Sequence, residues 1–113
     1  MVWQKSLTIA DQVIELIDHI ETSRKHFRLF EQLKSAVISV PMNIAEGKGR
    51  NSSKEFMHFL YIAKGSRYET LTLFEIFKLR TWISAEQFNE FDQMSNEIAK
   101  MINSLIKAIA HTL

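Results

Sequence analysis

The chain has 113 residues, of which 46% are hydrophobic and 24% charged, a balance typical of one globular domain spanning residues 1–113. It has no cysteine, which excludes disulfides and thiolate chemistry, and only three glycines and one proline, too few turn residues for an all-β fold. The longest uncharged run, residues 35–45, is shorter than the ~20 residues that a membrane-spanning helix needs. Residues 1–5 begin no apolar signal segment, so we expect a cytoplasmic protein.

The first half of the chain predicts two amphipathic helices. The first is expected over residues 5–23, with basic residues 24–26 at its negative end. The second is expected over residues 28–47. Pro41 lies inside its apolar pattern, which continues in register beyond the proline, so we expect a kinked helix rather than a break. Gly47 and Gly49 are expected to end this helix.

The second half predicts two longer helices, each opened by a capping box. Ser52 with Glu55 begins the third helix, which is expected to reach about residue 80. Ser84 with Gln87 begins the fourth, whose apolar stripe continues to Ile109. Short connections make neighbouring helices antiparallel. The sequence therefore predicts an all-α, up-down-up-down four-helix bundle.

The third helix has an unusually wide apolar surface. Its two adjacent stripes cover roughly 200° of the circumference, where a helix that buries one face needs little more than ~100°. One small bundle is not expected to cover so wide an arc, so we expect a homo-oligomer. The expected interface lies on the second stripe, which also includes Phe77, and consists of Phe59, Ile62, Ser66, Leu73 and Ile76.

A long motif connects the second and third predicted helices. Residues 39–50 read SVPMNIAEGKGR, followed by KEF at 54–56, FLYIAKGS at 59–66, and Glu69. This resembles the four-helix-bundle proteins encoded in intervening sequences of bacterial large-subunit ribosomal RNA genes, a family that includes the accessory protein of diversity-generating retroelements. The resemblance implies a ring-like homopentamer and, for the retroelement member, association with RNA and reverse transcriptase. Arg67 departs from the apolar or small residue usual there, so it either disturbs the local packing or has a partner across an interface.

The motif residues are expected mainly to fix the turn and the fold. Asn43, Glu46 and Arg50 recur at i, i+3 and i+7, along one edge of the second helix. Glu69 falls within the second apolar stripe of the third helix, where an unpaired carboxylate would be costly. We therefore expect Arg50 or another cation to pair with Glu46 or Glu69, and Asn43 to bond backbone groups near the kink. The residues assigned this structural role are Pro41, Asn43, Glu46, Gly47, Gly49, Arg50 and Glu69.

No catalytic constellation is recognisable in the sequence. Glu55 and His58 have the Glu-x-x-His spacing of a di-iron bundle, but no second copy of that motif exists. Arg50 and His58 are too far apart in the sequence to match the Arg–His pair of all-α toxin ribonucleases. We expect no enzyme, no metal site and no cofactor.

Two functions remain open. Residues 24–54 contain seven basic and two acidic side chains, a local charge of +5, which favours an anionic partner such as RNA. The alternative is a protein-interaction or scaffolding bundle with no nucleic-acid role, favoured by the overall net charge of +1 and by the wide apolar arc. The residues expected to bind nucleic acid are Arg24, Lys25, Arg28, Lys48 and Lys54.

Overall fold

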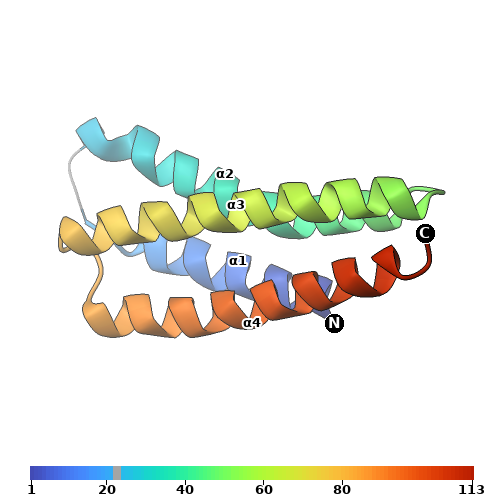
Figure 1. Ribbon diagram of the computed structural model, residues 1–113. Coiled ribbons are helices and arrows are strands. Elements are labelled where there is room, and N and C mark those ends of the chain that lie inside the picture. Colours follow the sequence, from blue (N-terminus) through green and yellow to red (C-terminus); the bar gives the residue numbers. More distant parts are fainter. Residues whose placement is uncertain (22–23) are drawn as a thin grey trace.

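The chain forms an antiparallel helical bundle (Figure 1). The computed structural model describes residues 1–21 and 24–113, except for the side chain of Arg24. These residues form α1 (Val2–Asp18), a single 3₁₀ turn (Arg24–His26), α2 (Phe27–Lys48), α3 (Ser53–Leu79) and α4 (Ala85–Ala110), and they include no strand. Successive helices run in opposite directions, so the predicted all-α bundle is confirmed.

α1 ends earlier than predicted. It stops at Asp18, and the backbone N–H groups of His19 and Ile20 bond to the carbonyls three residues back, which tightens the last turn. The chain then leaves the helix with Ile20 packed against the core. The expected basic helix end at residues 24–26 is therefore wrong, because His19 is the C-cap and the last turn holds no basic residue. The predicted end of the helix, Ser23, lies outside the described residues.

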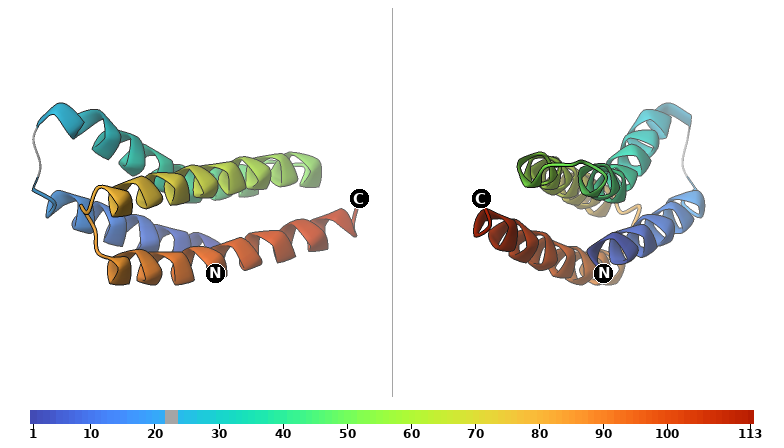
Figure 2. Two further views of the ribbon diagram at one scale, coloured as in Figure 1. Left: turned by 60° about the vertical axis from the view of Figure 1, so that its left-hand side comes forward. Right: turned by 90° about the vertical axis from the view of Figure 1, so that its right-hand side faces the viewer.

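α2 continues through Pro41, as predicted. Figures 1 and 2 show that its N-terminal part diverges from α3, whereas its C-terminal part runs alongside α3. The Asn43 side-chain amide donates to the Ser39 carbonyl at 2.8 Å, two residues before the proline. This bond agrees with the expectation that Asn43 bonds backbone groups near the bend.

Gly47 has a different role from the one predicted. It lies inside α2 rather than ending it, and Gly49 is the C-cap with φ −76°, so neither glycine adopts a left-handed conformation. A Cβ atom at Gly47 would lie 2.8 Å from the Phe59 Cβ and 3.2 Å from the Phe56 carbonyl oxygen. Gly47 is therefore needed because α2 and α3 approach closely, not because the helix must stop.

The α3–α4 connection is fixed by a Schellman motif. The Trp82 N–H bonds to the Phe77 carbonyl and the Thr81 N–H to the Lys78 carbonyl, each at 2.9 Å. Trp82 packs against Phe77, with ring centroids 5.0 Å apart, and against Phe30. This arrangement places Thr81 at φ 61°, a conformation that a β-branched residue adopts at a cost.

Replacing Thr81 with glycine is therefore expected to stabilise the protein. Glycine occupies positive φ without the Cβ clash, and the left-handed conformation costs other residues ~1–2 kcal/mol. We expect Thr81→Gly to raise the free energy of unfolding by about 1 kcal/mol in urea titrations. Thr72→Gly, an exposed position inside α3, is the control and should lower stability. If both variants lose the same free energy of unfolding, the conformation of Thr81 is not strained.

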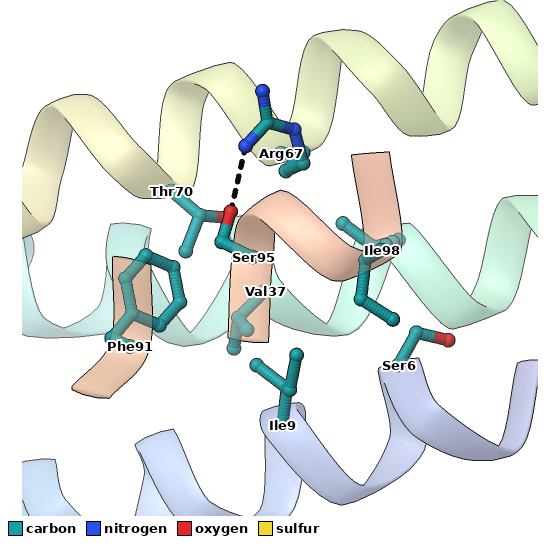
Figure 3. A pocket seen from close by; sticks show the side chains of 9 residues that line it. Ser6, Ile9, Val37, Arg67, Thr70, Phe91, Ser95 and Ile98 are labelled. Carbon is teal, nitrogen blue, oxygen red and sulfur yellow. Dashed lines mark hydrogen bonds between the residues drawn. The ribbon is translucent and has the colours of Figure 1, made fainter. Parts of the chain in front are cut away.

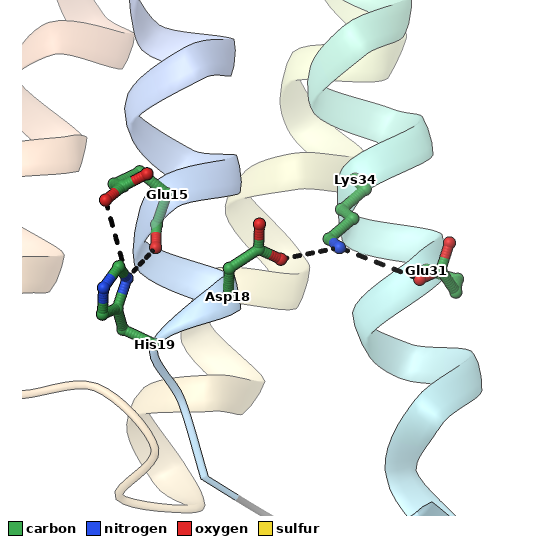
Figure 4. Close-up of polar contacts among 5 residues, drawn as sticks. All are labelled: Glu15, Asp18, His19, Glu31 and Lys34. Carbon is green, nitrogen blue, oxygen red and sulfur yellow. Dashed lines mark hydrogen bonds and ion pairs between the residues drawn. The ribbon is translucent and has the colours of Figure 1, made fainter.

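An ion pair joins the end of α1 to α2 (Figure 4). Lys34 of α2 bonds to Asp18 at 2.9 Å and lies 3.9 Å from Glu31. The bond to Asp18 raises the pKa of Lys34. On the solvent side of α1, the Glu15 carbonyl accepts a bond from the His19 ring, which together with the Glu15 carboxylate raises the pKa of His19. Of these contacts, the Lys34–Asp18 pair crosses between α1 and α2, whereas the other two lie within one helix or at its end.

Candidate functional site

The basic residues expected to bind nucleic acid lie at opposite ends of α2. Lys25 and Arg28 are exposed at its N-terminal end, and Lys48 and Lys54 are exposed beside the α2–α3 turn. A helix of 22 residues separates the two pairs by ~33 Å at 1.5 Å per residue. The side chain of the fifth expected residue, Arg24, is outside the described part of the chain. The local charge of +5 is therefore spread over two small patches.

Arg50 forms the predicted pair with Glu46 across one turn at the end of α2. Its guanidinium also lies 4.9 Å from the centroid of the Phe59 ring, so it covers part of the α2–α3 contact. Glu69, in contrast, is exposed, so its carboxylate needs no buried counter-charge. The expectation that Glu69 lies within an apolar stripe is therefore wrong.

A polar seam joins α2 to α3 where an external interface was expected. The hydroxyl groups of Ser39 and Ser66 are 2.8 Å apart, and the Asn43 amide donates to the Ser39 hydroxyl at 2.9 Å. Thr70, almost fully buried, donates to the Ser66 carbonyl. Ser66 therefore faces α2 of the same chain, and placing it on the interface with another subunit was wrong.

The other expected interface residues divide into two groups. Leu73 is 4% exposed and belongs to the core, which corrects its placement on an external face. Ile62 is 38% exposed, while Phe59 and Ile76 are half-buried. Part of the second stripe therefore packs against α2 of the same chain, and its outer edge reaches the surface.

Tyr61, Gly65 and Tyr68 extend this surface along the outer side of α3. The two tyrosines are 53% and 56% exposed, and a Cβ at Gly65 would meet nothing within 4 Å. Lys64 lies over the Tyr61 ring and Arg67 over the Tyr68 ring, at 5.5 and 4.8 Å from their centroids. We name Tyr61, Ile62, Gly65 and Tyr68 the outer face of α3.

Arg67 lies inside the bundle between α3 and α4 (Figure 3). Only 9% of the residue is exposed, and its guanidinium donates to the hydroxyl of buried Ser95 at 2.8 Å. No carboxylate of the described residues lies within ion-pair distance of it. Arg67 thus has a partner within its own chain. The sequence did contain a signal for Ser95, since this serine falls on the apolar stripe of α4 between Phe91 and Ile98.

Below Arg67, a cavity of about 20 Å³ lies among Ile9, Val37, Phe91 and Ile98 (Figure 3). Its volume is that of about one water molecule. The polar side chains around it are already bonded, because Ser6 donates to the Trp3 carbonyl and Thr70 to the Ser66 carbonyl. The cavity is therefore a packing void of the core.

The described residues contain no group of three or more His, Cys, Asp or Glu side chains that could hold a metal ion. His58, in the isolated Glu-x-x-His motif, is exposed, and its ring packs edge-on against Phe59 at 5.5 Å. None of the helices described is both long enough and apolar enough to span a membrane.

Comparison with known proteins agrees with the fold and with the motif of residues 39–69. No curated protein matches the chain in sequence. A protein of unknown function from the S23 ribosomal protein family of Bacteroides thetaiotaomicron VPI-5482 has a similar structure, with a TM-score of 0.87 and 29% identity, covering 95% of this chain and 99% of that one. The model of the 23S rRNA-intervening sequence protein family matches residues 1–104. The chain therefore belongs to the 23S rRNA-intervening sequence protein family.

Proposed function

We propose that this protein is a non-enzymatic, homo-oligomeric scaffold that binds protein partners, with five subunits as the family resemblance implies. The observation that carries the proposal is the outer face of α3, on which two tyrosines and Ile62 stay exposed beside a glycine with open space above it. Aromatic residues are enriched in protein interfaces, and a glycine allows a second helix to approach closely. This face is continuous with the half-buried Phe59 and Ile76.

The non-enzymatic part of the proposal is supported by the use of the buried polar groups. Ser6, Arg67, Thr70 and Ser95 bond to one another or to the backbone. Active sites instead direct such groups toward a space where a substrate can bind. In this bundle the Arg67–Ser95 bond joins α3 to α4, while Ser6 and Thr70 bond to backbone carbonyls of their own helices.

A charged side chain on the outer face of α3 is expected to break the assembly. Ile62→Glu should lower the mass measured by light scattering while the far-ultraviolet circular dichroism stays helical, because a carboxylate is costly in an apolar interface but not in water. Leu7→Glu is the matched control, since Leu7 has similar exposure, 42%, on α1. The proposal fails if Ile62→Glu keeps the wild-type mass, or if Leu7→Glu alone lowers it.

RNA binding is the second candidate, supported by four exposed basic side chains: Lys25, Arg28, Lys48 and Lys54. Each patch is small, but a ring would repeat it about the axis, so that weak phosphate contacts add together. The exposed Tyr61 and Tyr68 could also stack on bases.

The RNA candidate makes its own prediction. Binding of a fluorescent mixed-sequence RNA should weaken steeply between 50 and 200 mM salt, by roughly tenfold or more. The pair Lys25→Ala and Arg28→Ala should reduce the salt slope, because fewer counterions are then released. No binding at low salt and micromolar protein would remove this candidate and leave the scaffold.

A further inference from the structure

At one end of the bundle, α4 continues without α1 beside it. The side chains of Lys5 and Glu97 form an ion pair, which fixes the register of these antiparallel helices. From this pair α1 extends back only to Val2, whereas α4 extends on to Ala110. Beyond the ion pair, α4 therefore continues for ten residues more than α1, which corresponds to ~15 Å of helix. Figures 1 and 2 show the N-terminus beside the middle of α4, whose last turns face α2 and α3 without a fourth helix.

A groove of about 970 Å³ occupies this missing fourth position. Its apolar residues include Ile44 of α2, Phe56 of α3, and Met101 and Leu105 of α4. Leu105 is only half-buried, although it falls on the same apolar stripe as the fully buried Ile102. The apolar stripe of α4 therefore extends further than the chain's own helices cover it.

The charges of the groove are of one sign. Lys48 of α2 and Lys100 of α4 line it, both exposed, and the residues that line it include no carboxylate. Neither lysine has an ion-pair partner among the described residues. A surface with an apolar floor and two lysines is complementary to a helix with one apolar face and acidic residues beside it.

We propose that the groove binds an amphipathic α-helix with acidic flanks, supplied by a partner protein. The proposal rests on the proposed function, of which it specifies the partner. A helix suits the groove because α2, α3 and α4 already form three sides of a four-helix arrangement. A second copy of this chain does not suit it, because α1–α4 are already packed in their own bundle and cannot enter between α2 and α4. The occupant is a segment that is unpaired before binding and becomes ordered as a helix when it binds, so the binding free energy includes the entropic cost of that ordering.

The test is a binding titration with two designed peptides of about four helical turns. Both place leucines at i, i+3, i+4 and i+7. One has glutamates beside the leucines and the other has lysines. Fluorescence anisotropy should show saturable binding of the glutamate peptide, at least about tenfold tighter than that of the lysine peptide. Lys48→Glu with Lys100→Glu should reverse this preference, whereas Lys25→Glu with Arg28→Glu, the same charge change at the other end of α2, should not.

Three results would overturn the inference. They are no binding of the glutamate peptide, equal binding of both peptides, or the same change of peptide preference in the Lys48→Glu, Lys100→Glu variant and in the Lys25→Glu, Arg28→Glu variant. A lower assembly mass for the Lys48→Glu, Lys100→Glu variant would also overturn it, since the groove would then be an interface between copies. The proposed scaffold is tested separately by Ile62→Glu. If that variant lowers the mass but no peptide binds, the groove inference alone fails. If the peptide binds and wild-type protein is monomeric, self-assembly alone fails.

Discussion

Replacing Leu73 with glutamate is expected to unfold the bundle rather than to dissociate it. Leu73 is 4% exposed and lies in the core. Removing a buried leucine side chain costs ~2–5 kcal/mol, and burying a carboxylate in its place adds several more. Since the free energy of unfolding of a small domain is ~5–15 kcal/mol, the variant should lose most of its helical circular dichroism at pH 7.

Two comparisons make the Leu73 result specific. Leu73→Met conserves volume and should cost less than ~1.5 kcal/mol. Ile62→Glu, about three helical turns away on the same stripe but 38% exposed, should remain folded. Burial also raises the pKa of an introduced carboxyl group, so lowering the pH should restore part of the structure by favouring the neutral form. A folded, helical Leu73→Glu protein at pH 7 would show that Leu73 is not a core residue.

Replacing Gly47 with alanine is expected to destabilise the protein although alanine is the better helix former. The added Cβ would lie 2.8 Å from the Phe59 Cβ, with the backbone of α3 close behind. Such overpacking costs ~1–3 kcal/mol, and propensity returns about 1 kcal/mol at most. We expect a net loss of about 1–2 kcal/mol in denaturant titrations, and a larger loss for Gly47→Val.

Gly65 provides the matched control for Gly47. It also lies inside a helix, but a Cβ there meets nothing within 4 Å of the same chain. In the Ile62→Glu background, where no neighbouring subunit is expected to face Gly65, Gly65→Ala should therefore gain ~0.5–1 kcal/mol from helix propensity. If both alanine variants change stability in the same direction, the close approach of α2 and α3 at Gly47 is not what limits that position.

The helices themselves were predictable because their signals are local. The buried face of α2, including Leu33, Val37 and Ile44, follows directly from 3.6-residue periodicity. The Ser84–Gln87 capping box forms both of its bonds, as its spacing indicates. At α3, Ser52 accepts the bond from the Glu55 N–H and precedes the helix as predicted, but the second bond of the predicted capping box, from the Ser52 N–H to the Glu55 side chain, does not form.

The features that were missed depend on which helix lies beside which. Periodicity places Ile62 and Leu73 on one stripe, but only the packing of the other helices against α3 decides that Leu73 is covered and Ile62 is not. The roles of Gly47 and Ser66 likewise depend on how closely α2 approaches α3. Arg67 finds Ser95 across 28 residues of sequence, a pairing that no local pattern encodes.

The absolute mass of the wild-type protein tests most directly whether this bundle is a self-assembling scaffold. Light scattering coupled to size exclusion at micromolar concentration should give a single species at five times the chain mass of 13.2 kDa. The mass should not depend on salt, because the outer face of α3 is mainly uncharged. A stable monomer of 13.2 kDa across the same concentrations would contradict the claim.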